Sequence, residues 1–307
     1  MLKGVAFLFP GQGSQRVGMG RDLYERFAEA REVFDLAEET LRIPLKDFCF
    51  EGPIGALTQT ENAQPALLTT QTAIMRLIPE LPSVVAGHSL GEYSAYVASK
   101  ALSFQDALRV VRKRGELMTE VASEHKGGMI AVIGPELREV QEKLKGIAAG
   151  VAEVANLNLP TQIVISGDSA GLKSAEESLR GIGKVVWLNV SAPFHCSLMS
   201  GVEVRLREAI LALNWQNPKV PVYRNMDALK VTDVDRAKEG LVHQVSSPVH
   251  WYETIEQMLQ EGVETFVEIG PSRVLAGMLR RFAKGKGVIS VGDAQTLESG
   301  LRSLGIV

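Results

Sequence analysis

The chain has 307 residues, of which 45% are hydrophobic and 22% are charged. These values are typical of a globular protein and argue against collagen, a coiled coil or intrinsic disorder. The net charge of −3 and the aromatic content of 6% argue against a nucleic-acid-binding protein. No apolar run reaches the roughly 18 residues that span a bilayer, so no membrane association is expected.

The length predicts two domains, or one large domain with an insert, since a domain has about 150 residues. Cys49 and Cys196 are the only cysteines and lie far apart, which favours a reducing compartment over a disulfide framework. The apolar N-terminal segment stops at Pro10 and lacks a small-residue cleavage site, so a buried strand is expected there rather than a signal peptide. Together these features predict a cytoplasmic protein.

Strands and helices are predicted to alternate along the chain. Val5–Phe9 is the first strand, and apolar residues at helical spacing predict a helix over residues 22–41. A second helix is predicted over 63–78, with Pro65 in its first turn, where proline is tolerated. The other elements are a strand at 83–86, helices that begin near 90 and 104, a strand at 263–269 and a helix at 272–282. This alternation predicts an α/β fold with a mostly parallel sheet covered on both faces.

The middle of the chain has a different order of elements. Strands are predicted at 129–133, 151–155, 162–166 and 184–190, with helices at 136–144 and 169–179. The order β-α-β-β-α-β is that of a ferredoxin-like unit. We therefore expect a small subdomain of residues 126–190, which begins after His125 in a glycine-rich stretch. It is inserted into a large subdomain of residues 1–125 and 191–307.

Residues 87–91 (GHSLG) follow a short predicted strand and precede a predicted helix. This is the context of a nucleophile elbow, in which glycines permit a tight turn that exposes the serine hydroxyl at the end of a sheet. Ser89 is therefore the candidate nucleophile. The alternative is an ordinary glycine-rich turn, because so short a pattern also arises by chance.

A serine nucleophile needs a base, and the chain has five histidines. His195 follows the last strand of the predicted insert, where a cleft is expected, so it is the first candidate, and His250 is the next. His88 would point away from its serine neighbour, His125 lies at the expected junction, and His243 lies in a polar stretch. A structural role is the alternative for each of them.

An α/β-hydrolase places an acid between the serine and the histidine in the chain. Asp168 is the best placed, but its position predicts an N-cap for the helix at 169–179. The lack of a better acid favours a Ser–His dyad in which a backbone carbonyl orients the imidazole.

Residues 9–15 (FPGQGSQ) form a glycine-rich loop after the first strand. Arg16 stands where a dinucleotide-binding loop needs glycine, and the Walker pattern is also missing, so no nucleotide cofactor is expected. The loop instead predicts an oxyanion hole formed by the N–H groups of Gln12 and of Leu90, the residue after the candidate nucleophile. A tight strand exit is the alternative.

The helix predicted from Phe104 begins with a capping box, Ser103-x-x-Asp106. Its apolar positions share one face, and Arg114 lies in the middle of that face. A buried guanidinium needs a carboxylate partner. That partner is either an internal acid or a carboxylate of the substrate.

Two further features leave alternatives open. Cys196 beside His195 is either a reactive thiol or, as is more common, a buried one. Residues 280–286 (RRFAKGK) form a basic run that includes Arg280, Arg281, Lys284 and Lys286, and it is either a solvated face or a docking surface for an acidic partner. No metal site is expected, because the histidines and cysteines lack the spacing of zinc ligands.

Taken together, residues 9–15, 87–92 and 193–195 resemble the motifs of the malonyl-CoA:acyl carrier protein transacylase family of fatty-acid synthesis. Residues 263–278 are also similar to that family, so the resemblance covers essentially the whole chain. It implies an α/β-hydrolase-like large subdomain with a mostly parallel sheet and an inserted ferredoxin-like small subdomain. Both agree with the predicted elements.

The same resemblance implies roles for individual residues. Ser89 is the nucleophile and His195 the base, the N–H groups of Gln12 and Leu90 bind the oxyanion, and Arg114 binds the malonyl carboxylate.

Less firmly matched positions also acquire roles from the resemblance. The main-chain carbonyl of His250, where the family commonly has Gln or Asn, is expected to orient His195. Phe194 resembles the malonyl-selecting form of related synthase domains, and its ring is expected to disfavour a methyl branch.

The implied activity is a ping-pong transfer of a malonyl group from malonyl-CoA to the phosphopantetheine thiol of acyl carrier protein. It proceeds through a malonyl-serine intermediate and needs no cofactor. Two other functions stay open: a serine esterase or thioesterase on the same elbow, and a non-catalytic acyl-binding partner of a synthase assembly. The first would leave the burial of Arg114 unexplained, and the second would form no acyl-serine.

Overall fold

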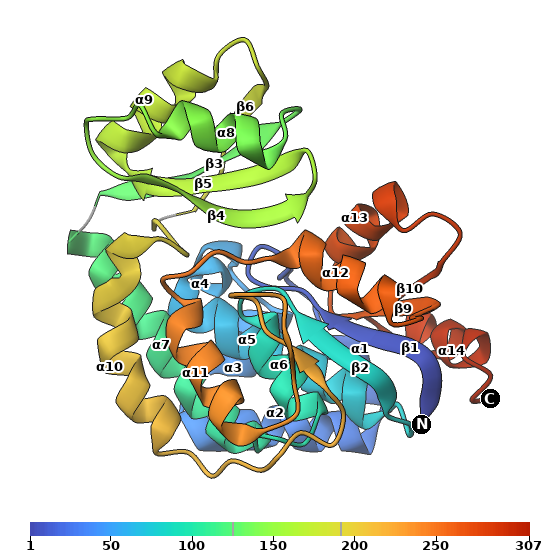
Figure 1. The fold of residues 1–307 in the computed structure, drawn as a ribbon. Coiled ribbons are helices and arrows are strands. Elements are labelled where there is room, and N and C mark those ends of the chain that lie inside the picture. The colour runs from blue at the N-terminus through green and yellow to red at the C-terminus, as the bar shows by residue number, and fades with distance from the viewer. Residues whose placement is uncertain (125, 191) are drawn as a thin grey trace.

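The computed structural model describes residues 1–124, 126–190 and 192–307. The expected junction residue His125 and residue 191 therefore lie outside the described residues. The described chain forms a six-stranded sheet and a separate four-stranded sheet. In Figure 1 the smaller sheet, coloured green to yellow, lies above the larger body. None of the helices in these ranges combines the length and the apolar character needed to cross a membrane.

The large sheet is mostly parallel, as predicted. Its strands are β1 (Leu2–Phe9), β2 (Pro82–Gly87), β7 (Val222–Tyr223), β8 (Lys230–Val231), β9 (Thr265–Ile269) and β10 (Gly287–Val291). They lie in the order β10-β9-β1-β2-β7-β8, and all neighbours pair in parallel except β7 and β8. Residues 5–9 of β1 are all buried, because successive side chains enter hydrophobic cores on opposite faces of the sheet.

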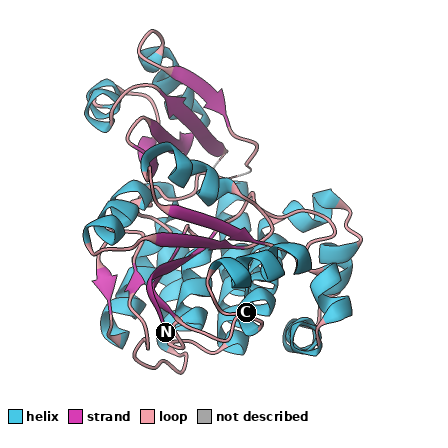
Figure 2. Cartoon of the chain, turned by 90° about the vertical axis from the view of Figure 1, so that its right-hand side faces the viewer, coloured by secondary structure: helices cyan, strands magenta, loops and turns pink. Residues whose placement is uncertain are grey.

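Helices cover both sides of this sheet (Figure 2). Before the small sheet in the chain come α1 (Arg21–Arg26), α2 (Ala28–Leu41), α3 (Leu45–Phe50), α4 (Ile54–Thr58), α5 (Thr60–Arg76), α6 (Gly91–Ala98) and α7 (Phe104–Glu124). After it come η1 (Ser197–Met199), α10 (Ser200–Leu211), α11 (Val234–Gln244), α12 (Trp251–Gln260), α13 (Val274–Phe282) and α14 (Ala294–Ser303). Helices α12 and α13 pack on one face of the sheet, and helices such as α2, α5, α7 and α10 contribute to the core on the other.

Two predicted helices differ from those of the structure. The segment 22–41 is not one helix, because Phe27 has extended backbone angles (φ −121°, ψ 127°) and separates α1 from α2. Helix α5 begins at Thr60 rather than at 63, so Pro65 lies in the helix interior and not in its first turn. Pro65 has no N–H for the carbonyl of Glu61, and that carbonyl accepts a hydrogen bond from Arg112 Nη1 instead (3.0 Å).

The small sheet has the predicted ferredoxin-like order of elements. These are β3 (Gly127–Ile133), α8 (Leu137–Leu144), β4 (Ala152–Leu159), β5 (Gln162–Asp168), α9 (Ser169–Leu179) and β6 (Lys184–Trp187), with strand order β4-β5-β3-β6. β6 is shorter than the predicted strand 184–190. Asp168 caps α9, as predicted, by accepting a hydrogen bond from Gly171 N (2.7 Å).

The two faces of the small sheet have different partners. Alternate residues of β3, such as Ile130 and Val132, form a core with the sheet's own helices. Met129 and Ala131 point the other way and belong to the main core of the large body. The edge strand β4 is also joined to the large body through the backbone. Leu157 N donates to Val249 O (2.9 Å), and Val249 N donates to Ala155 O (2.8 Å).

Candidate active site

The turn between β2 and α6 holds Ser89 in a left-handed backbone conformation, with φ of 52°. The two flanking glycines make this turn possible. A Cβ atom on Gly87 would lie 1.9 Å from the Gly91 carbonyl group, and one on Gly91 would lie 1.9 Å from Phe9 O. The predicted strand–turn–helix arrangement is therefore present, and any larger side chain at either glycine would disrupt it.

Ser89 and His195 lie in hydrogen-bond contact. The distance from Ser89 Oγ to His195 Nε2 is 2.7 Å, and His195 Nδ1 lies 2.9 Å from the main-chain oxygen of Gln244. Because a carbonyl only accepts, Nδ1 carries the proton and Nε2 is free to accept the serine proton. His195 itself has φ of 61°, so both members of the pair have left-handed backbone.

The carbonyl that orients the imidazole belongs to Gln244 and not to His250, which corrects the expectation from the sequence. His250 is the N-cap residue of α12. Its carbonyl accepts hydrogen bonds from Thr254 N (3.0 Å) and Thr254 Oγ1 (2.8 Å), and its ring faces Glu253. The His250 carbonyl is thus occupied within its own helix.

The remaining described histidines have partners away from the Ser89 hydroxyl. His88 Nε2 is hydrogen-bonded to Asn158 Oδ1 (2.9 Å), and His243 Nδ1 lies 2.9 Å from Glu203 Oε1. Asp168 is committed to its helix cap, so it is not the third member of a triad.

Burial and the nearby positive charge of Arg114 lower the pKa of His195 to about 3. The ring is therefore neutral at pH 7. A neutral imidazole with a free Nε2 lone pair, 2.7 Å from a serine hydroxyl, can act as a general base.

Arg114 is fully buried on the inner face of α7, as the sequence predicts, with only 1% of its surface exposed. Its Nη2 donates to Ser89 Oγ (3.2 Å) and to Gln244 Oε1 (3.0 Å), while Nε has no acceptor among the described residues. No carboxylate of the described chain forms an ion pair with the guanidinium within 4.0 Å, and the buried Glu92 is linked to it only indirectly, through Gln244. The internal acid that the sequence left open is thus not found there, and the guanidinium lines the cavity above Ser89.

Three polar residues that sequence reasoning did not select hold these groups in place. Gln244 Nε2 donates to Ser89 O (2.9 Å) and to Glu92 Oε2 (2.8 Å). Asn225 accepts from Ser89 N (2.6 Å) and donates to Gly87 O (2.7 Å). The Glu92 carboxyl also accepts from Asn225 N (3.0 Å), and burial raises its pKa to about 7.

The only local signal for these residues was the position of Glu92, directly after the GHSLG motif. Gln244 and Asn225 belong to no short motif. They reach the elbow from the end of α11 and from the segment after β7.

The glycine-rich loop lies against the elbow. A Cβ atom on Gly11 would approach His88 O to 2.5 Å, and Gln71 Nε2 fixes the loop by donating to Pro10 O (2.7 Å). Within the described chain, the backbone N–H groups of Gln12 and Leu90 donate no hydrogen bond. Both are therefore free to bind an oxyanion.

A cavity of about 300 Å³ connects these groups. Its lining includes the loop at 10–15, Ser89, Arg114 and His195, together with residues of the small sheet and of α13. Phe194, which directly precedes His195 in the sequence, also lines the cavity, and 8% of its surface is exposed. Burial raises the pKa of the Cys196 thiol, which favours the inert alternative for that residue.

The basic run begins on the helix that borders this cavity. Val274, Leu275 and Met278 of α13 line the cavity, and Arg280 and Arg281 follow on the same helix with exposed side chains. Lys286 pairs with Glu264 (2.6 Å). Within the described ranges, no group of His, Cys, Asp or Glu side chains is arranged to hold a metal ion.

Comparison with known proteins gives consistent matches along the chain. Residues 6–297 match the acyl transferase domain family. A malonyl CoA-acyl carrier protein transacylase of Bacillus subtilis is 44% identical over 308 residues, which cover 98% of this chain and 97% of that protein.

Solved structures also match over nearly the whole chain. The crystal structure of an acyl carrier protein S-malonyltransferase from Vibrio cholerae has a TM-score of 0.94 and 36% identity, covering 97% of this chain and 100% of the other. A complex of a type II PKS acyl-carrier protein with its malonyl-transacylase has a TM-score of 0.94 and 34% identity, covering 97% and 99% of the two chains.

Proposed function

Because this chain belongs to the acyl transferase domain family, among its malonyl CoA-acyl carrier protein transacylases, we propose that it transfers malonyl groups from malonyl-CoA to acyl carrier protein. The reaction would supply extender units for fatty-acid synthesis in the cytoplasm. The observation that carries the proposal is the Ser89–His195 contact of 2.7 Å beside the buried Arg114, whose side-chain acceptors among the described residues are Ser89 and Gln244 and not a carboxylate.

The first half-reaction acylates the enzyme. Ser89 Oγ attacks the thioester carbonyl carbon of malonyl-CoA while His195 Nε2 takes the hydroxyl proton. The N–H groups of Gln12 and Leu90 bind the oxyanion of the tetrahedral intermediate. When the carbon–sulfur bond breaks, His195 returns the proton to the departing sulfur, and coenzyme A leaves a malonyl ester on Ser89.

The second half-reaction reverses the roles. The phosphopantetheine thiol of acyl carrier protein gives its proton to His195 and attacks the malonyl-serine ester. The proton then returns to Ser89 Oγ as the ester bond breaks. The Gln244 carbonyl keeps Nδ1–H oriented and stabilises the imidazolium that forms in each half-reaction.

Arg114 supplies the choice of malonyl in this mechanism. The Nε of Arg114 has no acceptor among the described residues, and Nη2 donates a hydrogen bond to the Ser89 hydroxyl. A substrate carboxylate that binds this guanidinium would therefore lie directly beside the reacting atoms. Phe194 would narrow the same cavity and disfavour a methyl branch on the malonyl group.

The proposed division of the chain follows the two sheets. Residues 1–125 and 191–307 would form the large catalytic subdomain, and residues 126–190 the small one. The cavity is lined from both: Met129 and Val164 come from the small sheet, and Ser89 and His195 from the large subdomain.

Mass spectrometry after brief mixing with malonyl-CoA tests this function. The protein should gain one malonyl group, and Ser89→Ala should gain none. Ser14→Ala removes another serine of the same cavity and should still be acylated. His195→Ala should slow acylation by about 10²–10⁴ as the general base is lost.

The outcomes also separate the other functions. An adduct that is lost to water as fast with acyl carrier protein as without it would indicate a thioesterase. No adduct in any form of the protein would indicate a non-catalytic acyl-binding protein. An adduct that persists in Ser89→Ala would overturn the assignment of the nucleophile.

A further inference from the structure

A second and larger cavity of about 710 Å³ lies at the opposite end of the β-sheet from Ser89. It is bordered by Pro82, where β2 begins, whereas Ser89 follows the other end of that strand. The two cavities share no lining residue. The volume lies within the range of about 300–1,000 Å³ that is common for small-molecule sites.

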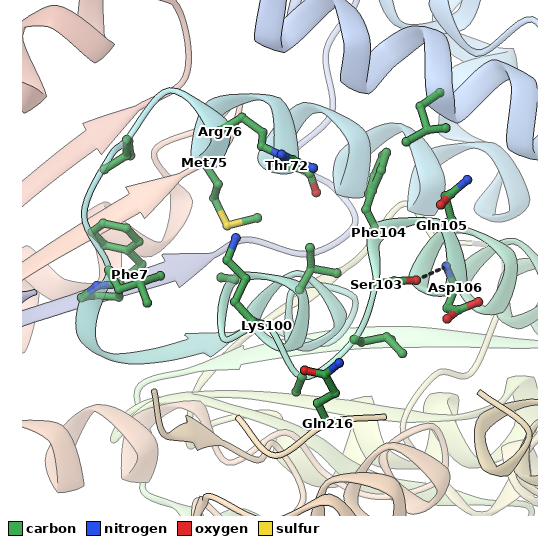
Figure 3. A pocket seen from close by; sticks show the side chains of 18 of the residues that line it. Phe7, Thr72, Met75, Arg76, Lys100, Ser103, Phe104, Gln105, Asp106 and Gln216 are labelled. Atoms are coloured by element: carbon green, nitrogen blue, oxygen red, sulfur yellow. Dashed lines mark hydrogen bonds between the residues drawn. The ribbon is translucent and has the colours of Figure 1, made fainter. Parts of the chain in front are cut away.

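The cavity walls are of mixed chemistry. Figure 3 shows Met75, Thr72 and Arg76 of α5 on one side and Lys100, which follows α6, on the other, with the Lys100 ammonium pointing toward Met75. Its apolar surface comes from Leu36, Met75, Ile78, Val97, Leu102 and Phe104. A ligand that fills this space therefore needs an apolar body.

One polar group of the wall has no partner inside the protein. Thr72 lines the cavity with only 3% of its surface exposed, and its Oγ1 has no hydrogen-bond partner among the described residues. The Thr72 hydroxyl oxygen is closed off from solvent, so Thr72 contributes to the shape of the wall and not to ligand hydrogen bonding.

The charges of the wall do not cancel. Within the described chain, no carboxylate lies within 4.0 Å of Arg76 or Lys100, whereas both acids of the wall are already paired. Glu80 binds the N-terminal amine (2.8 Å), and Asp106 binds Arg109 (3.2 Å). Partial burial and, to a lesser extent, the charges of Arg76 and Lys219 lower the pKa of Lys100, although the side chains of Lys100 and Arg76 are both exposed at the cavity mouth.

The position of Lys100 is itself unusual. It follows the end of α6 with φ of 64°, a place where glycine is the common residue. A lysine there keeps the strain of left-handed backbone and adds a charge to the cavity wall.

We propose that this cavity is a binding site for a small organic anion, whose apolar body contacts the walls and whose acidic head lies between Arg76 and Lys100. A carboxylate and a phosphate head share this chemistry. The site does not depend on the acyl transfer proposed above.

Calorimetric titration with decanoate and with decyl phosphate tests the site, with decanol and decyltrimethylammonium as neutral and cationic probes. At least one of the two anions should bind, and the neutral and cationic probes should bind at least about tenfold more weakly. Whichever anion binds more tightly identifies the head group. Equal binding of decanol, or no binding of either anion, would overturn the proposal.

Variants locate the anion. Arg76→Met and Lys100→Met keep apolar stems and should each weaken binding by roughly tenfold, since each removes a charge-assisted hydrogen bond. Lys173→Met removes an exposed lysine of α9 and should change nothing. Gln216→Trp places a large ring at the cavity from an exposed loop residue and should reduce binding without affecting the core.

Arg114→Ala distinguishes this site from the Ser89 cavity and should leave unchanged the anion binding that is weakened in Arg76→Met and Lys100→Met. Loss of binding in Arg114→Ala, with retention in Arg76→Met and Lys100→Met, would place the anion beside Ser89 and refute the second site. Melting temperatures of all variants show whether each protein is folded.

Discussion

At the level of single residues, the charge state of His195 controls the proposed chemistry. Its Nε2 accepts a proton only when the ring is neutral, and burial together with the charge of Arg114 lowers its pKa to about 3. The neutral form therefore persists far below the usual histidine pKa of about 6.5.

This pKa predicts the pH profile of the malonyl-CoA half-reaction. The contribution of His195 to kcat/KM should stay nearly constant as the pH falls from 8 to about 5.5, because His195 does not take up a proton in that interval. Glu92, with a pKa of about 7, also titrates there, so the profile is measured for Glu92→Gln as a control. A loss of activity centred near 6.5 that persists in Glu92→Gln would show that His195 has an ordinary pKa.

Arg114 gives a second prediction at this scale, on selectivity. Arg114→Ala should reduce malonyl transfer by roughly 30- to several-thousand-fold, because breaking a desolvated charge pair costs about 2–5 kcal/mol. Acetyl transfer should fall little or even rise, since acetyl-CoA has no carboxylate. Arg114→Lys should rescue malonyl transfer only in part, because lysine lacks the planar fork.

The comparison of the two donors, with thermal melting alongside, checks this prediction. Equal losses for malonyl-CoA and acetyl-CoA, with a large drop in melting temperature, would mean that Arg114 acts mainly in the fold.

Among the elements, the β2–α6 turn has the least freedom to change. Gly87→Ala or Gly91→Ala would place a methyl group 1.9 Å from backbone atoms, so the turn must open or the strand must move. Either change should lower the free energy of unfolding by about 4 kcal/mol or more. Gly277→Ala in α13 is the matched control, since nothing lies within 4 Å of its Cβ position.

Denaturant unfolding measures all three variants. Gly277→Ala should be neutral or stabilising by about 0.5–1 kcal/mol, as expected for alanine in an exposed helix position. An elbow variant as stable as Gly277→Ala would contradict the tight packing between β1, β2 and α6.

The elements with regular hydrophobic spacing could be predicted from the sequence, and those set by long-range contacts could not. The ferredoxin-like order and the parallel strands follow from apolar periodicity, which is a local property. The break at Phe27 leaves that periodicity intact. In the first turn of α5, the carbonyl that Pro65 leaves without a donor is bonded by Arg112, which lies in another helix.

The same distinction applies to the site. Ser89, His195 and Arg114 have side chains whose chemistry or burial is visible in the sequence. The group that orients His195 is a main-chain carbonyl, which every residue possesses, so choosing Gln244 over His250 required the three-dimensional structure. Asn225 was missed for a similar reason, since its importance comes from contacts with distant residues.

In the whole molecule, α13 connects the Ser89 cavity with a basic surface. Its first residues line the cavity, and Arg280 and Arg281 at its end are exposed. A carrier protein that delivers its thiol to Ser89 would pass close to these charges, and an acidic partner would be attracted by them.

Transfer to acyl carrier protein should therefore weaken with salt, while transfer to free pantetheine thiol should change little. The double variant Arg280→Glu/Arg281→Glu should slow the first reaction and spare the second. Arg138→Glu, a charge reversal at an exposed position of α8, is the control. Steady-state rates over a range of ionic strength measure the effect, and unchanged carrier turnover in the double variant would place docking elsewhere.

The backbone bridge between β4 and Val249 bears on how such proteins diversify. Both of its hydrogen bonds join main-chain groups, so they specify no side chain and exclude only proline at 157 and 249, where an N–H is donated. Residues of the cavity wall beside these two hydrogen bonds can therefore be substituted while the two sheets keep the same register. Exchange of the small sheet between related proteins should succeed when the extended backbone at 155–157 is preserved and the donor keeps apolar side chains that fit the main core, as Met129 and Ala131 do here.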